Sequence, residues 1–98
     1  MPDRSGIMFH FAARARRDEI AEHGLTPTTG CFRDNPDGVY LWEQDPRTFL
    51  GGFASVFDPA QGDLYTVEVD GLDLQPDRWL PCAVYSSEPI PAARVTRI

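Results

Sequence analysis

The feature that most constrains the fold is the segment 38–42, Gly-Val-Tyr-Leu-Trp, which is followed directly by Glu-Gln-Asp-Pro. Strand side chains alternate, so Val39 and Leu41 fall on one face and the two aromatic residues on the other. Asp45 is a good N-cap, and Pro46 fits the first position of a helix. We therefore expect a short strand with one buried face, followed by the start of a helix.

Tyr40 and Trp42 lie together on the second face of this predicted strand. Large rings with polar tips suit the wall of a ligand cleft. They equally suit a half-buried part of the core, and the spacing leaves both interpretations open.

Apolar residues alternate with others in several further segments, which is the pattern of half-buried strands. This pattern predicts strands at residues 7–11, 64–69, 80–86 and 95–98.

In the first of these strands, Ile7, Phe9 and Phe11 form an apolar face that we expect to enter the core. Met8 and His10 then lie on the opposite face. On that face His10 is either a solvated or second-layer histidine or a functional one.

Helices are expected in two places. Residues 12–23 are rich in good helix formers, and Gly24 supplies the stop. Further along, Phe49, Phe53 and Phe57 recur every four residues, which predicts an amphipathic helix with these rings in the core. The resulting order of elements is β-α-β-α-β-β-β.

Length and composition limit the class of protein. A chain of 98 residues makes a single domain, 1–98. No apolar run approaches the length of a membrane span, and the N-terminus lacks the pattern of a signal peptide, so we expect a cytoplasmic protein. Cys31 and Cys82 form neither a disulfide framework nor a metal site, and we expect free thiols and no metal.

The net charge of −6 argues against a nucleic-acid duplex as a general partner, because phosphate backbones repel an acidic chain. All nine basic side chains are arginine. One small cluster, Arg14, Arg16 and Arg17, could still hold a single phosphate group.

Four short motifs occur in a defined order. His10 lies between two phenylalanines, the first predicted helix ends in Glu-His-Gly-Leu at 22–25, Val-Tyr-Leu follows at 39–41, and Pro-Ile-Pro occupies 89–91. This succession, from residue 8 to residue 98, resembles the ADP-ribosyltransferase fold. That group includes poly- and mono-ADP-ribosyltransferases of the diphtheria-toxin type and the RNA 2′-phosphotransferases. The resemblance implies a minimal α+β fold with two short helices packed on a split, mainly antiparallel sheet.

The resemblance also implies NAD as the ligand, held by a set of His, Tyr and Glu residues. His10 would hydrogen-bond the ribose next to nicotinamide, and Tyr40 would stack on the nicotinamide ring. Phe11, Trp42 and Arg14 complete the residues expected along this NAD cleft.

The glutamate of the family's set would stabilise the oxocarbenium-like transition state as nicotinamide leaves. The matching positions, 80–82, hold Leu-Pro-Cys. Glu88, beyond that strand, is then the candidate for the catalytic carboxylate, with Glu68 on the preceding strand as the other possibility. Glu88 can also be an exposed turn residue.

Two functions follow as expectations. One is a small NAD-dependent mono-ADP-ribosyltransferase that modifies a protein, a nucleic acid or a small molecule. The alternative is a non-catalytic module of the same fold that binds a nucleotide-like ligand or a protein partner. An RNA substrate is disfavoured, because an acidic chain lacks the basic surface that such a substrate needs.

Overall fold

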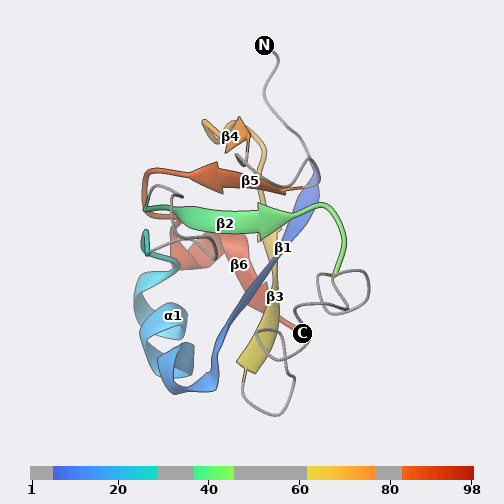
Figure 1. Cartoon of the computed structure of the whole chain (residues 1–98). Coiled ribbons are helices and arrows are strands. Elements are labelled where there is room, and N and C mark those ends of the chain that lie inside the picture. The colour runs from blue at the N-terminus through green and yellow to red at the C-terminus, as the bar shows by residue number, and fades with distance from the viewer. Residues whose placement is uncertain (1–5, 29–36, 46–61, 77–82) are drawn as a thin grey trace.

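Six strands form one antiparallel sheet, and a single short helix packs beside it in the described part of the chain (Figure 1). The computed structural model describes residues 6–28, 37–45, 62–76 and 83–98. The strand order across the sheet is β4-β5-β2-β1-β3-β6. The fold is therefore a small α+β domain, as expected from the sequence.

The strands and helical turns follow one another in chain order. Their bounds are β1 (Ile7–Ala13), η1 (Arg14–Arg16), α1 (Arg17–His23), β2 (Val39–Trp42), β3 (Gly62–Glu68), β4 (Gln75–Pro76), β5 (Ala83–Ser86), η3 (Ala92–Arg94) and β6 (Val95–Arg97). In the described ranges no helix is long and apolar enough to cross a membrane.

The strand predictions are largely confirmed where the chain is described. The segment around Tyr40 forms β2, and residues 64–69 and 95–98 coincide closely with β3 and β6. β4 was not among the predicted strands. The predicted phenylalanine helix and residues 80–82 lie outside the described residues.

The longest ladder joins β1 to β3, with every residue of β1 paired from Ile7↔Glu68 to Ala13↔Gly62. Directly paired residues in an antiparallel ladder point to the same side of the sheet. The ladder therefore decides which side chains of β1 and β3 share a face.

The main core lies on the face of β1 that carries Met8 and Ala12, and the prediction that Ile7, Phe9 and Phe11 face this core is wrong. Ile7 is 53% exposed, whereas Met8 is 3% exposed. Alternation alone does not say which face turns inward, and here the partner strand decides. Met8 pairs with Val67, while Phe9 pairs with a threonine.

The core cluster draws on the helix and on four of the strands. Its members are Met8, Ala12, Ile20, Leu25, Val39, Leu41, Tyr65, Val67, Val69, Val84 and Ile90. The side of β3 that carries Tyr65 and Val67 is therefore a core face, and Val69 after the strand joins the same cluster.

The first helix is shorter than predicted. β1 continues through Ala13, η1 follows, and α1 begins only at Arg17. Ala12 and Ala13 pair with Asp63 and Gly62, so ladder hydrogen bonds override the helix preference of alanine. Ile20 anchors α1, since it is the buried residue of that helix.

Gly24 ends α1 as predicted, and the structure shows why glycine is needed there. Its φ of 80° and ψ of −156° lie in a region that side chains rarely allow. A Cβ at this position would overlap the carbonyl oxygen of Ile90 and come within 2.6 Å of the Ala92 nitrogen. The next residue, Leu25, exchanges two 2.8 Å backbone hydrogen bonds with Ile90.

Gly24→Ala is expected to destabilise the domain by more than about 2 kcal/mol, because backbone strain adds to a contact between main chains. The measurement is the free energy of unfolding from urea titration. Gly71→Ala is the matched control, since Gly71 has a φ of 78° and a Cβ added there would meet nothing within 4 Å. An equal loss of stability in both variants would contradict the close approach at Gly24.

Candidate functional site

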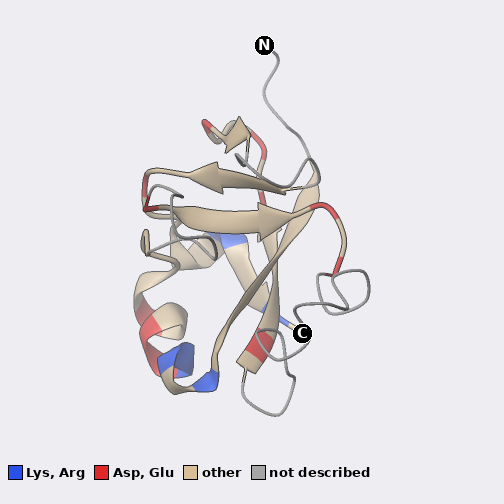
Figure 2. Ribbon diagram, in the orientation of Figure 1, with Lys and Arg blue, Asp and Glu red and all other residues tan. Residues whose placement is uncertain are grey.

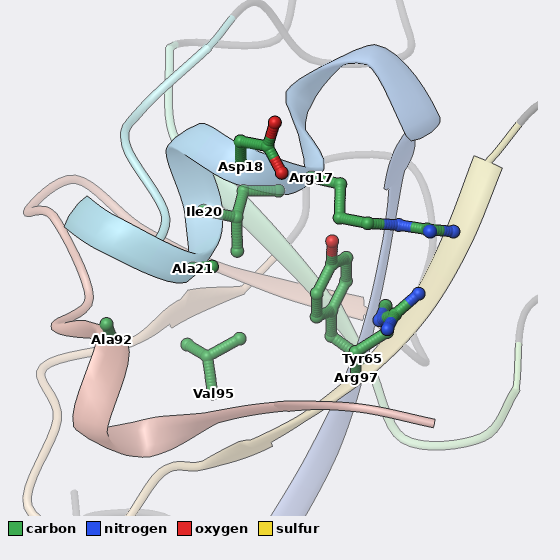
Figure 3. A pocket seen from close by; sticks show the side chains of 8 residues that line it. All are labelled: Arg17, Asp18, Ile20, Ala21, Tyr65, Ala92, Val95 and Arg97. Carbon is green, nitrogen blue, oxygen red and sulfur yellow. The ribbon is translucent and has the colours of Figure 1, made fainter.

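A pocket of about 430 Å³ opens between α1, β3, η3 and β6 (Figure 3). Its apolar lining consists of Ile20, Ala21, Ala92 and Val95. Its polar lining consists of Arg17, Asp18, Tyr65 and Arg97. Small-molecule sites typically enclose about 300–1,000 Å³ and combine an apolar wall with a few polar groups, and this pocket fits that description.

Tyr65 reaches this pocket from the core face of β3. The residue is 3% exposed, and its hydroxyl oxygen is buried with no hydrogen-bond partner in the described part of the chain. Burial, followed by the nearby charge of Asp63, raises the pKa of the phenol, so the hydroxyl keeps its proton at neutral pH. It is therefore a donor that lacks an acceptor, which is costly in a folded protein.

Arg17 is held in a fixed position at the pocket by Asp63. Its Nε donates to Oδ2 at 2.9 Å, and its Nη2 donates to Oδ1 at 2.7 Å. The carboxylate is only 8% exposed, and hydrogen bonding from Arg17 is the main cause that lowers its pKa. Such a two-point contact orients the planar guanidinium group as well as binding it.

Further arginines gather around the same carboxylate. Arg14 Nε lies 3.7 Å from Asp63 Oδ1, and both Arg14 and Arg97 help to lower the pKa of Asp63. Figure 2 shows the basic residues of η1 and the start of α1 beside the acidic start of β3. A chain with a net charge of −6 thus concentrates positive charge at one end of the sheet.

His10, the first residue of the predicted NAD set, bonds to the neighbouring strand. Its Nδ1 donates to the Tyr40 backbone oxygen at 2.7 Å. A carbonyl oxygen only accepts, so the proton of the neutral ring sits on Nδ1. Burial lowers the pKa of His10 to about 4, which keeps the imidazole neutral. His10 thereby links β1 to β2, whose ladder has the pair Phe9↔Trp42.

The side chains of His10 and Tyr40 leave opposite faces of the sheet. His10 shares the core face of β1 with Met8, so the prediction that it lies on the face away from the core is wrong. Tyr40 lies on the side of β2 opposite its core residue Leu41. The Tyr40 ring instead contacts the ring of Tyr85, with centroids 5.2 Å apart.

The other residues predicted for the NAD cleft have different surroundings in the structure. Trp42 and Tyr40 are 3% and 7% exposed, so these rings are more deeply buried than the half-buried position considered from the sequence. Phe11 lies against Gly62 on β3, and Arg14 joins Asp63. The NAD cleft stays a prediction drawn from the resemblance.

Glu88 follows β5 in an exposed turn. The Ser86 hydroxyl makes two hydrogen bonds with the backbone of Glu88. It donates to the carbonyl oxygen at 2.8 Å and accepts from the amide nitrogen at 3.2 Å. This placement agrees with the turn interpretation of Glu88, and its role as a catalytic carboxylate stays a prediction. Among the described residues, no cluster of His, Cys, Asp or Glu is arranged to hold a metal ion.

Tyr65 and Arg97 were not singled out as site residues from the sequence. Both lie in strands at positions that no local motif marks. The one available signal was the tyrosine itself, because a buried phenol in a valine-rich strand needs a hydrogen-bond partner.

Comparisons with models of protein families and with curated proteins gave no match for this chain. The pocket is therefore interpreted from its own chemistry.

Replacing Asp63 with asparagine is expected to lower the urea midpoint of unfolding at pH 7, because the amide removes the charge that Arg17 and Arg14 share. Asp73→Asn is the control, since Asp73 is exposed and accepts a hydrogen bond from Gln75 alone among the described residues. Equal midpoints for wild type and Asp63→Asn would contradict a stabilising role of this ion pair.

His10 predicts a specific pH dependence of stability. Its pKa falls from 6.5 in the unfolded chain to about 4 in the folded one, so its contribution is complete above pH 6.5 and is lost as the pH falls toward 4. Between pH 7.5 and pH 5 this loss amounts to about 2 kcal/mol. Urea unfolding of wild type and His10→Asn at both values measures it, and the same decrease in both proteins would contradict the assignment.

Proposed function

We propose that this protein is a non-catalytic binding module for a small organic anion, which it holds in the pocket between α1 and β6. The observation that carries the proposal is the buried Tyr65 hydroxyl, a donor without an acceptor among the described residues, which lines this pocket beside two arginines. It shares the absence of catalysis with the alternative expected from the sequence, but that alternative binds a nucleotide-like ligand or a protein partner instead of a small organic anion.

The polar groups of the pocket favour a negatively charged ligand. Arg97 lines the pocket, and no hydrogen bond or ion pair of its guanidinium group occurs among the described residues. Arg17 uses part of its N–H groups for Asp63 and retains others. A carboxylate or phosphate oxygen would accept from the Tyr65 hydroxyl and from a guanidinium group together, and arginine suits both anions geometrically.

The apolar lining favours an organic anion over an inorganic one. Ile20 is 1% exposed, and Val95 packs against the core cluster, so both present a firm hydrocarbon surface to the pocket. Each methylene group that a ligand buries there adds about 0.8 kcal/mol of favourable free energy. A ligand with a short hydrocarbon body and an anionic end would use both halves of the lining.

Binding requires a side-chain movement at the mouth, because the Tyr65 hydroxyl is fully enclosed in the unbound protein. Arg97 is exposed and can move, while Arg17 stays bound to Asp63. A rotamer change of an exposed arginine is fast and needs little free energy compared with opening a core.

ADP-ribosyl transfer from NAD would require His10 and Tyr40 at one nicotinamide riboside. The alternation of the strands directs these two side chains to opposite faces of the sheet, and positions 80–82 hold no acidic residue. We therefore place binding ahead of transfer as the function.

The test is NMR titration of the labelled protein with 4-methylpentanoate, AMP and NAD in separate experiments. We expect 4-methylpentanoate to shift the amide signals of α1, β3 and β6. Tyr65→Phe should weaken its binding about tenfold or more, since a hydrogen bond to a charged group contributes about 1.5–3 kcal/mol. The same variant should be more stable than wild type without ligand, because it removes an unsatisfied hydroxyl.

Tyr85→Phe is the matched control, since Tyr85 contacts Tyr40 and does not line the pocket. The proposal fails if neither the carboxylate nor the phosphate probe shifts the pocket signals, or if Tyr65→Phe binds as wild type does. Shifts with NAD centred on β1 and β2 that are lost in His10→Asn would favour the NAD cleft instead.

A further inference from the structure

We infer that the natural ligand is amphoteric: besides its anionic group it carries an ammonium group, which Asp18 binds, and its class is that of small apolar amino acids. This inference rests on the proposed function and assigns a role to a charge in the pocket that an anion alone leaves unused.

Asp18 is a carboxylate on the wall of a pocket that otherwise favours anions. It is exposed at the start of α1, and no hydrogen bond or ion pair of its side chain occurs in the described ranges. Its nearest basic neighbour in sequence, Arg17, is engaged by Asp63. Asp18 is one of the nearby charges that raise the pKa of Arg17, but its carboxylate oxygens have no hydrogen-bond donor in the described ranges and can accept from a ligand.

Arg97 offers the opposite charge from the other wall. Asp18 belongs to α1 and Arg97 to β6, and Tyr65 lies between these elements in the close view (Figure 3). The two charged side chains line one cavity without forming an ion pair with each other. Two opposite charges on separate walls can each hold a different group of one ligand.

The amine provides selectivity as well as affinity. An organic acid without an amine places its carboxylate in the field of Asp18, which is a like charge and lowers affinity. A ligand with several phosphates would bring still more negative charge to the same wall. An ammonium group turns this repulsion into a charge-assisted hydrogen bond.

The apolar lining sets the size of the remaining part. Ile20, Ala21, Ala92 and Val95 are all aliphatic, and the pocket has a volume of about 430 Å³. Branched aliphatic side chains of a ligand complement such a surface. A polar side chain would bury its own polar groups there without hydrogen-bond partners. L-leucine is accordingly the probe that matches the pocket in charge, size and polarity.

The experiment compares L-leucine with two analogues, 4-methylpentanoate, which lacks the amine, and 3-methylbutylamine, which lacks the carboxylate. Dissociation constants come from calorimetry, and the site from amide shifts of labelled protein. We expect leucine to bind about tenfold more tightly than 4-methylpentanoate and the amine to bind most weakly, because charge-assisted bonds add to one another.

Asp18→Asn should remove most of the preference for leucine while leaving or improving the binding of 4-methylpentanoate. Asp73→Asn, an exposed aspartate outside the pocket, should leave every constant unchanged. Asp18 is also exposed, so the variant is expected to fold, and an unchanged spectrum of the unbound protein verifies this.

The inference is overturned if wild type binds leucine and 4-methylpentanoate equally, or if the preference survives in Asp18→Asn. In that case Tyr65-dependent binding of 4-methylpentanoate would still support the anion site. If no carboxylate or phosphate probe binds at the pocket, the proposed function and the inference are both overturned.

Discussion

The ladder between β1 and β3 is the constraint on which the rest of the structure depends. It pairs every residue of β1 with β3 and holds these two neighbouring interior strands in one register. A shift of one residue in this pairing would turn either Met8 and Ala12 on β1 or Tyr65 and Val67 on β3 out of the core. The burial of Val67, which is 0% exposed, therefore favours this register over the shifted ones.

The same ladder also builds the charged end of the sheet. β1 ends at Ala13 opposite Gly62, so the arginines that follow turn directly toward Asp63, the next residue of β3. Asp63 binds Arg17 through two hydrogen bonds and has Arg14 nearby. The buried carboxylate of Asp63 thus holds arginine side chains close together in a domain whose net charge is negative.

Tyr65 is an exception to the rule that buried polar groups are hydrogen-bonded. Strand register, core burial and helix ending all agree with one another, yet this buried hydroxyl has no partner among the described residues. Such departures concentrate at functional sites, where stability is given up for ligand binding. The phenol, Arg97 and Asp18 then form a site from three different elements, which explains why no single motif marks it.

The sequence by itself determined the local elements: alternation located β2, β3 and β6, and Gly24 located the end of the helix, because these signals act over a few residues. It did not determine which face of β1 is buried, since alternation is symmetric and the partner strand breaks the symmetry. It assigned Ala12 and Ala13 to a helix because alanine has a high helix propensity. In the structure, hydrogen bonds between β1 and β3 outweigh this preference. Only the tertiary structure brought Tyr65 and Arg97 to one pocket, because their proximity comes from pairing and packing between segments far apart in the chain.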